Sequence, residues 1–350
     1  MIRSLSTLTF SALIGALFLG ALCLIAGESP VRVVEIVIQN SMLNQEDLAV
    51  TLFYSTHLMF AATGLCLAMH AGLFPIGAEG QISISCLATT VVGLLMGPSP
   101  FGIFLALLAG PLTAAGLGAV TAYFKVKKSS HEVIVTMMLN FLSASVANYL
   151  VSHFFQSSES QNPETGTLAP AFKLFSPLFS LANTPANSSF YLAIAVCFLG
   201  WFVLSRTRWG YEIRAVGLNH SVAAHSGISR ARVITTVLIV SAALAGLSSF
   251  NQILGYNLKY QVGFSADYGF LAIVVALMAS RNPLFVIPAS FFFAILMKGS
   301  AELDIDTDTI TRDFVKIIEG FLILAFVLAQ KIDLKSLFSR KRIDDESSRA

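Results

Sequence analysis

Six polar side chains lie in or beside long apolar stretches, where groups that contact a solute or carry a proton would stand out. They comprise one carboxylate and five amides: Glu79, Gln81, Asn140, Asn148, Asn251 and Gln252. Amides inside a membrane usually hydrogen-bond neighbouring helices, but they can also line a polar path. If they line a path, neutral amides suit an uncharged polyol or nucleoside better than an ion.

Glu79 belongs to the stretch His70-Ala-Gly-Leu-Phe-Pro-Ile-Gly-Ala-Glu-Gly-Gln81, whose glycines and Pro75 interrupt two apolar runs. A carboxylate is stabilised at a helix N-terminus, so Glu79 is expected to cap the helix that follows. A role in gating or in substrate passage is the alternative. An ion-coupled carrier needs an embedded carboxylate, and Glu79 and Glu319 are the candidates.

The sequence contains no motif for catalysis or nucleotide binding. It lacks G-x-x-x-x-G-K-[ST], H-E-x-x-H, C-x-x-C and G-x-S-x-G. We therefore expect no enzymatic activity, no catalytic residue, no metal site and no cofactor in this chain.

An acidic run also fails to match a metal site. Asp304, Asp306 and Asp308 are spaced like the start of a calcium loop, but Thr309 and Val315 replace the required glycine and glutamate. A solvated external loop is expected, which could dock a partner protein.

The elements that position these residues are membrane spans. Of 350 residues, 55% are hydrophobic and only 12% are charged, with a mean hydropathy of +0.74, whereas soluble domains carry about 25% charged residues. The fold class is therefore all-α, a polytopic membrane protein. Ten spans of suitable length are predicted: 6–26, 51–70, 81–97, 101–124, 132–155, 189–205, 233–255, 268–281, 284–298 and 313–331.

Basic residues give the orientation. With the N-terminus inside, the cytoplasmic side holds sixteen of the 22 Lys and Arg, and six fall on the other side: Arg32, Lys173, Lys259, Lys298, Arg312 and Lys316. Because basic residues favour the cytoplasmic side, both termini are expected there.

Two interruptions suggest an internal symmetry. The break at 72–80 and the short spans around Pro283 occupy comparable places if the chain is divided after the fifth span. Two inverted halves of five helices follow, because five crossings reverse the orientation, and paired broken helices point to a transport path. Ordinary loops between short helices are the alternative.

The longest internal loop, 206–232, is longer than a turn requires. Ser221 to Ser226 favour a short helix, Gly227 is suited to end it, and Ala223 and Ala224 allow close approach of another backbone. Such a helix suits a soluble partner. A basic loop resting on anionic lipid is the alternative.

Several of these stretches resemble a known family. "RAVGLNHSVAAHSGIS" at 214–229 is similar to the coupling loop of ABC-importer permeases. "GLFPIGAEGQ" at 72–81, "HEVIVTMMLNFLSASVANYLV" at 131–151, "YGFLAIVVALMASRNPL" at 268–284 and "IIEGFLILAFVLA" at 317–329 resemble the ribose, simple-sugar and purine-nucleoside permeases of the branched-chain amino acid/ribose permease superfamily. The likeness covers roughly residues 50–330. It departs at Pro75, where the family usually has Asn, and at Ser280 and Phe285, where it tends to have glycines.

The resemblance implies the permease of an ATP-driven importer for nucleosides or simple sugars in the bacterial inner membrane. The implied contacts to the ATPase are Arg214, Gly217, Asn219, Ala223, Ala224 and Gly227. ATP would be bound by the partner. The other implied partners are a second permease, identical or paralogous, an extracytoplasmic substrate-binding protein and the lipid bilayer, with no nucleic acid.

The expected organisation is one transmembrane domain over 1–335, with its coupling loop at 206–232, and a cytoplasmic tail over 336–350. Two other functions stay open. A secondary carrier driven by an ion gradient fits inverted halves and broken helices equally well, and a scaffold protein would transport nothing.

Overall fold

The computed structural model describes residues 29–158, 160–174, 184–265 and 267–306, together with Ile317 and Gly320. Within these ranges every named element is helical, apart from two isolated β-bridges. The residues fall into two compact units, one of residues 41–298 and one that includes 29–40 and 299–306. In the smaller unit, Val37 lies against Gly299.

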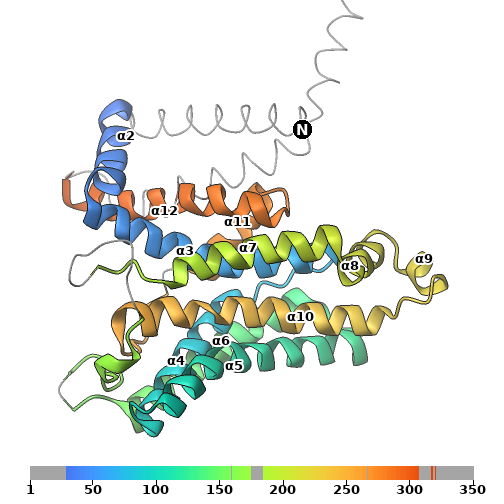
Figure 1. Ribbon diagram of the computed structural model, residues 1–350, viewed down its shortest axis with the longest axis horizontal. Helices are drawn as coiled ribbons and strands as arrows, with labels where there is room; N and C mark the ends of the chain where they lie inside the picture. Colours follow the sequence, from blue (N-terminus) through green and yellow to red (C-terminus); the bar gives the residue numbers. More distant parts are fainter. Residues whose placement is uncertain are drawn as a thin grey trace, which may run out of the picture. The chain divides into compact units, whose positions relative to one another are not determined.

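The helices follow the predicted order (Figure 1). In chain order they are α2 (Pro30–Ile38), the π-turn η1 (Gln39–Leu43), α3 (Gln45–His70), α4 (Ala78–Met96), α5 (Pro100–Lys127), α6 (Glu132–Leu150) with its π-turn η2 (Val151–Phe155), the 3-10 turn η3 (Pro170–Phe172), α7 (Ser189–Arg206), α8 (Arg208–Leu218), α9 (His220–His225), α10 (Arg230–Gly246) with the π-turn η4 (Phe250–Asn257), α11 (Tyr268–Met278) and α12 (Pro283–Asp306).

Seven helices are long and apolar enough to cross a membrane, counting only described residues, so the prediction of an all-helical polytopic membrane protein is confirmed. The predicted first span, 6–26, lies outside the described residues, as does 313–331 apart from two positions.

The predicted span 268–281, which the sequence marks as short, contains a helix that is shorter still. Its helix, α11, has only 11 residues, about 16 Å against the ~30 Å of a bilayer core. It ends because Ser280 and Arg281 adopt φ values of 50° and 63°, which turn the chain before Pro283. In contrast, α12 continues to Asp306, so Asp304 and Asp306 lie in its last turn and not in the predicted loop, while Asp308 is outside the described residues.

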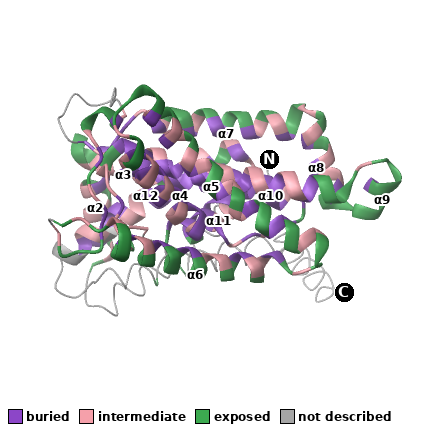
Figure 2. Cartoon of the chain, turned by 90° about the horizontal axis from the view of Figure 1, so that it is seen from below, coloured by how far each residue is buried: buried purple, intermediate pink, exposed green. Residues whose placement is uncertain are grey.

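α3 is the central helix, buried along almost its whole length and packed against α7, α10 and α11. Small residues let the neighbours approach closely, as is common in membrane bundles: a Cβ at Gly64 would lie 2.5 Å from the Ser241 carbonyl oxygen, and one at Gly118 would lie 2.5 Å from that of Leu238. Figure 2 shows exposed residues along α6 and α7 and over α9.

The segment between α6 and α7 is held by two β-bridges where the structure describes it. Gln156 pairs with Thr165, and Glu164 pairs with Gln261 beyond η4, both as antiparallel bridges. The described cysteines Cys66, Cys86 and Cys197 are free and buried, as expected for small apolar side chains.

Candidate functional site

The predicted break between the second and third spans is present. α3 ends at His70, Gly72 takes a φ of +74°, and α4 begins at Ala78. The Leu73 N–H bonds back to the Ala68 carbonyl at 3.0 Å, which closes the end of α3. Residues 73–77 then continue without helical structure, so their backbone groups need other partners.

Those partners lie on one face of α6, at four-residue spacing; we call them the α6 ladder: Glu132, Thr136 and Asn140. The Phe74 N–H donates to Oε1 of Glu132 at 3.3 Å, and the Ile76 N–H donates to Oγ1 of Thr136 at 3.0 Å. Asn140 accepts from the Gly80 N–H at 2.9 Å and donates to the Ile76 carbonyl at 2.7 Å. The break therefore lies alongside α6 over about 12 Å, the rise of eight helical residues.

The first residue of the α6 ladder carries a buried charge. Glu132 is 5% exposed, and its second carboxylate oxygen accepts from Nζ of Lys125 at 2.5 Å. The pair keeps the carboxylate compensated at the break, because a buried charge without a partner is costly. Sequence reasoning had selected only Asn140. The spacing 132, 136, 140 was the available signal, but it did not indicate which backbone segment these residues hydrogen-bond.

Glu79 lies in the first turn of α4, as predicted, but its hydrogen bonds go to another helix and not to the N–H groups of α4. Its Oε2 accepts from the Gly269 N–H at 2.7 Å and its Oε1 accepts from the Ser265 hydroxyl, so it caps α11. A Cβ at Gly269 would lie 2.6 Å from Cα of Glu79. The N-termini of two helices therefore meet, and the carboxylate offsets the partial positive charge of both.

Two of the predicted amides are buried and already engaged. Asn251 accepts from Asn187 at 2.8 Å and from Ser189 at 3.0 Å, and its own amide donates to the Phe53 carbonyl at 2.8 Å. Asn140 is engaged in the α6 ladder. Both fit the interpretation as contacts between helices.

Gln252, the next residue, differs. It is 5% exposed, and its Oε1 has no hydrogen-bond partner among the described residues. It reaches His57 of α3, yet neither ring nitrogen of His57 completes a hydrogen bond with any described residue. Gln81 is also buried, at 7% exposed, close to Gly77.

Aromatic rings surround His57. Its ring stacks on Tyr268 with centroids 4.7 Å apart and 6° between planes, and meets Phe53 edge-on at 4.9 Å. The ring centroids of Tyr54 and Tyr268 are 6.1 Å apart, and those of Tyr256 and Phe53 are 5.4 Å apart. The sequence did not indicate this cluster, because its members come from α3, η4 and α11.

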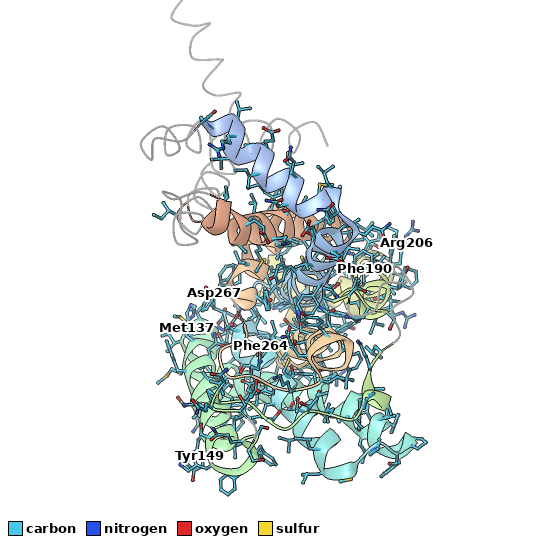
Figure 3. All side chains as sticks on the ribbon, turned by 90° about the vertical axis from the view of Figure 1, so that its left-hand side faces the viewer. Met137, Tyr149, Phe190, Arg206, Phe264 and Asp267 are labelled. Atoms are coloured by element: carbon cyan, nitrogen blue, oxygen red, sulfur yellow. The ribbon has the colours of Figure 1, made fainter. Side chains whose placement is uncertain are left out.

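Asn148 lies on the exposed side of α6, the long span with the smallest buried share. It forms a polar strip with two further exposed residues, Ser145 and Ser152. The Ser152 hydroxyl is 3.4 Å from Oδ1 of Asn148. Figure 3 shows this side of α6, with Met137 and Tyr149 labelled. A polar strip on a membrane helix is unfavourable against hydrocarbon.

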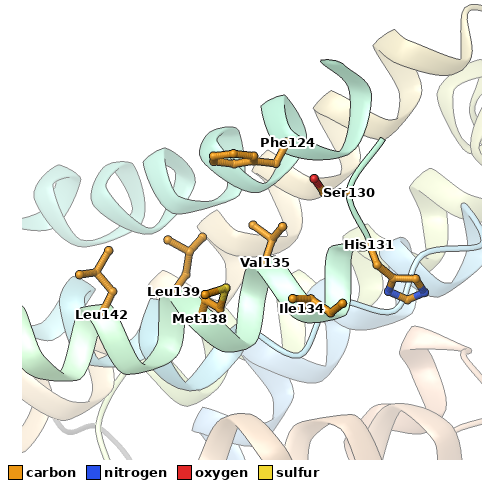
Figure 4. Close-up of a pocket in the computed structure, with 8 residues that line it drawn as sticks. All are labelled: Phe124, Ser130, His131, Ile134, Val135, Met138, Leu139 and Leu142. Atoms are coloured by element: carbon orange, nitrogen blue, oxygen red, sulfur yellow. The ribbon is translucent and has the colours of Figure 1, made fainter. Parts of the chain in front are cut away.

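An apolar groove of about 540 Å³ opens beside the start of α6 (Figure 4). It is lined by Phe124, Ser130, His131, Ile134, Val135, Met138, Leu139 and Leu142. Without convergent polar groups it lacks the donors and acceptors that orient a polar ligand.

At one end of the bundle, a single apolar cluster joins the ends of α3 and α5 to α8, α9 and the start of α10. Its buried members are Leu67, Ala68, Ala71, Leu73, Ala122, Leu204, Ile213, Val216, Ala223, Val233, Ile234, Val237 and Leu238. The basic residues of these same elements, among them Lys125, Lys127, Arg208 and Arg230, therefore gather at this end.

The short helix predicted in the 206–232 loop is present as α9. Asn219 caps it, accepting from the Ser221 and Val222 N–H groups at 3.0 and 3.2 Å. At the other end Gly227 takes a φ of +78° and donates to the Ala224 carbonyl at 3.0 Å. Both ends of a six-residue helix are thus closed, which compensates for its small length.

The predicted coupling residues divide by position. The Arg214 guanidinium donates to the Leu204 carbonyl, Gly217 lies against the backbone at His70, and Ala223 is buried in the apolar cluster, so these three hold the loop to the bundle. Ala224 is exposed. Leu218 and Val222, which sequence reasoning missed, are 89% and 62% exposed.

At the opposite end, Glu164 ties the 156–174 segment to the chain beyond η4. It accepts from Lys259 Nζ and Gln261 Nε2, each at 2.9 Å. These hydrogen bonds, the one from Lys259 foremost, lower the pKa of Glu164 to about 2. Tyr260 beside them is 1% exposed and bonds Ser83 at 2.8 Å, and burial raises its pKa to about 12.

The described residues contain no group of three or more His, Cys, Asp or Glu side chains that could hold a metal ion. What they contain instead is a broken-helix centre, an exposed polar strip and a capped helix at the basic end.

Known proteins resemble this chain over most of its length. A family described as the permease component of the branched-chain amino acid transport system matches residues 48–327. The chain is 27% identical to the glucose ABC transporter permease protein TsgB13 of Haloferax volcanii, over 91% of this chain and 86% of that protein. It is 28% identical to the guanosine ABC transporter permease protein NupP of Bacillus subtilis, over 77% of each. With the nucleoside ABC transporter permease protein NupB of Lactococcus lactis it is 26% identical, over 95% of this chain and 92% of that protein.

Proposed function

This chain belongs to the family of branched-chain amino acid transport system permease components, and from this premise we propose that it carries nucleosides or simple sugars across the membrane. It is the permease of an ABC importer, an integral membrane transport subunit and not an enzyme, and ATP is bound by the ATPase partner. The family match over 48–327 carries the proposal, because it covers nearly all of the described spans and the 206–232 loop. The substrate class rests on the relatives, which are permeases for glucose, guanosine and nucleosides.

The coupling loop meets the ATPase through α9. The exposed residues Leu218, Val222 and Ala224 form the contact, and Asn219 and Gly227 keep the helix closed. Arg214, Gly217 and Ala223 pass the movement of α9 to the ends of α3, α8 and α10, because they bind it to the bundle. ATP binding shifts the permease between inward and outward openings by its higher affinity for one of them.

The translocation path forms between this chain and a second permease, identical or paralogous. The polar strip of α6, with Asn148, lines it, since a path supplies the polar surroundings that lipid does not. A substrate-binding protein delivers the solute to the end that carries Glu164. The acidic run of Asp304, Asp306 and Asp308 is a second place for that protein to dock.

The basic end of the bundle is cytoplasmic, which places both termini there. Residues 1–335 form one permease domain of about ten spans in two inverted halves, followed by a short tail. The contact between Glu79 and the N-terminus of α11 supports the inverted arrangement, because it joins the two interrupted regions.

A first experiment tests the coupling loop. The tagged protein is purified in mild detergent, and co-purifying proteins are identified by mass spectrometry. An ATP-binding subunit is expected with the wild type and lost with Ala224→Asp. Ala231→Asp is the matched control, because Ala231 is also exposed at this end but lies in α10. Retention of the ATPase by Ala224→Asp would contradict α9 as the contact.

A second experiment separates the importer from an ion-driven carrier. Proteoliposomes with the assembled complex and the binding protein should take up labelled nucleoside or sugar only with ATP. Uptake by the permease alone under a proton or sodium gradient would show a secondary carrier and overturn the proposal.

A further inference from the structure

Two neighbouring amides in η4 behave in opposite ways. Asn251 is 1% exposed and uses both ends of its amide in hydrogen bonds to α3 and to the residues before α7. Gln252, equally enclosed, leaves its carbonyl oxygen without a partner among the described residues. Packing alone does not explain Gln252, because an apolar side chain of similar length would fill the site without a desolvated oxygen.

His57, beside Gln252, also has buried polar atoms without hydrogen-bond partners among the described residues. It is fully buried in α3, and neither of its ring nitrogens has a hydrogen-bond partner among the described residues, although Gln252 reaches it. A neutral imidazole has one donor and one acceptor on different sides of its ring, and the Gln252 oxygen is an acceptor. If the imidazole N–H lies on the side of Gln252, one donor stands beside one acceptor, which is complementary to a ring edge that carries a carbonyl group next to an N–H group.

The walls around these polar atoms are aromatic. Tyr268 lies parallel to His57 at 4.7 Å, and Phe53 lies edge-on to it at 4.9 Å. Flat aromatic faces bind planar rings by stacking and tolerate many substituents. Tyr268 is the first residue of α11, where the Gly269 N–H donates to Glu79 beside the α4 break, and Glu79 also accepts from Ser265. The stack therefore lies where the N-termini of α4 and α11 meet, a place that can open without unwinding a long helix.

We propose that His57 and Gln252 form a contact site for the transported solute, a planar uncharged heterocycle with adjacent carbonyl and N–H groups, which enters as Tyr268 moves away from His57. The proposal rests on the proposed function, and it adds the site and the part of the substrate recognised there. A nucleoside of the guanosine type carries such a ring edge, whereas a simple sugar does not.

The test compares substitutions that keep shape and remove polar atoms. His57→Phe keeps the stacked ring, Gln252→Met keeps the length of the side chain, and Asn251→Leu is the matched control. Melting of the purified complex is measured beside ATP-driven uptake of guanosine and of ribose per assembled complex. His57→Phe and Gln252→Met should melt at or above the wild-type temperature, while guanosine uptake falls at least tenfold. Asn251→Leu should melt lower, because three described partners lose their bonds.

Several outcomes would overturn the site. If His57→Phe and Gln252→Met lower the melting temperature as Asn251→Leu does, these groups hold the fold. Unchanged guanosine uptake, or an equal fall for ribose, also removes the assignment to a heterocycle. A wild-type complex that imports neither solute contradicts the proposed function instead, so the two failures are distinguishable.

Direct labelling gives an independent readout. Photolysis of the wild-type complex with 8-azidoguanosine should modify peptides that contain His57 or Gln252, and excess unlabelled guanosine should suppress the labelling. Labelling elsewhere in the chain, with none at these peptides, would contradict the site.

Discussion

Polar side chains of the same type make different contacts in this bundle. Asn140 and Asn251 close backbone and side-chain hydrogen bonds, Asn148 faces outward, and Gln252 keeps an unbonded oxygen. Glu79 binds a helix other than its own. The role of each side chain therefore depends on the groups that lie next to it in the folded bundle, and not on its residue type.

Replacing the capping carboxylate tests this at α11. Glu79→Gln should lower the free energy of unfolding by about 1–2 kcal/mol, because the charge no longer offsets two helix N-termini. Thermal melting of the purified protein measures the loss, and Glu79→Asp, which keeps the charge, should lose less. Equal stability of Glu79→Gln and the wild type would show that the charge at this junction is unimportant.

The hydrogen bonds of Glu164 predict how acid affects the segment 156–174. Its pKa of about 2 in the folded protein is lower than the ordinary value of 4.5, so its stabilising effect is present above about pH 4.5 and is lost as the pH falls towards 2. Protection of residues 156–174 against hydrogen exchange, taken relative to the intrinsic exchange rate at each pH, should therefore fall over that interval. In Glu164→Gln this protection should already be low at neutral pH and change less with acid, whereas an unchanged acid response would contradict the assignment.

At the scale of elements, the α3–α4 break is as organised as a helix, but its hydrogen bonds come from α6. Replacing Thr136 by Val removes the acceptor of the Ile76 N–H while keeping the shape. The variant should lose about 1–3 kcal/mol of stability, the cost of an unpaired buried group, as measured by melting. Thr113→Val is the control, since Thr113 is exposed and bonds only carbonyls of its own helix; a matching loss in both variants would argue against the α6 ladder.

The cap of α9 predicts a split between stability and binding. Gly227→Ala forces an alanine into a left-handed φ, although no atom lies within 4 Å of its Cβ, at a cost of about 1–3 kcal/mol. The variant should retain less ATPase in co-purification. Gly97→Ala also forces an alanine to a positive φ at an equally open position, but Gly97 lies between α4 and α5 at the other end. It should therefore keep the ATPase, and loss in both variants would show a general effect of instability.

Long apolar runs, the break at 72–80 and α9 could be predicted, because hydropathy, Gly and Pro positions and helix caps are local signals. The shortness of the helix before Pro283 could be predicted too, but its end at Met278 could not, since that end depends on positive φ values at Ser280 and Arg281. The helix that Glu79 caps depends on a contact between residues 190 positions apart, and the cluster around His57 depends on one between residues 211 positions apart. No local spacing contains that information.

At the scale of the whole chain, charge and polarity are arranged by end and by side. Basic residues gather at the end with α8 and α9, Glu164 and its partners lie at the other, and the polar strip of α6 faces outward. The proposed function assigns one partner to each feature: the ATPase to the end with α9, the binding protein to the end with Glu164, and a second permease to the polar strip.

Cysteine labelling checks this orientation. In a background with Cys23 replaced by Ser, His225→Cys should react with an impermeant maleimide only after the cells are opened, whereas Gln161→Cys should react in intact cells. Both positions are exposed, and the described native cysteines are buried. The reverse pattern would invert the assigned orientation.

The break along α6 also has a consequence for biosynthesis. Its bonds join residues 58 to 64 positions apart, so residues 74–80 leave the ribosome well before the side chains that satisfy them. Until α6 is inserted, these backbone groups cannot rest in hydrocarbon, and they must stay at the aqueous surface or in the insertion machinery. The break is therefore completed late, and a nascent chain stalled before residue 140 should still expose it.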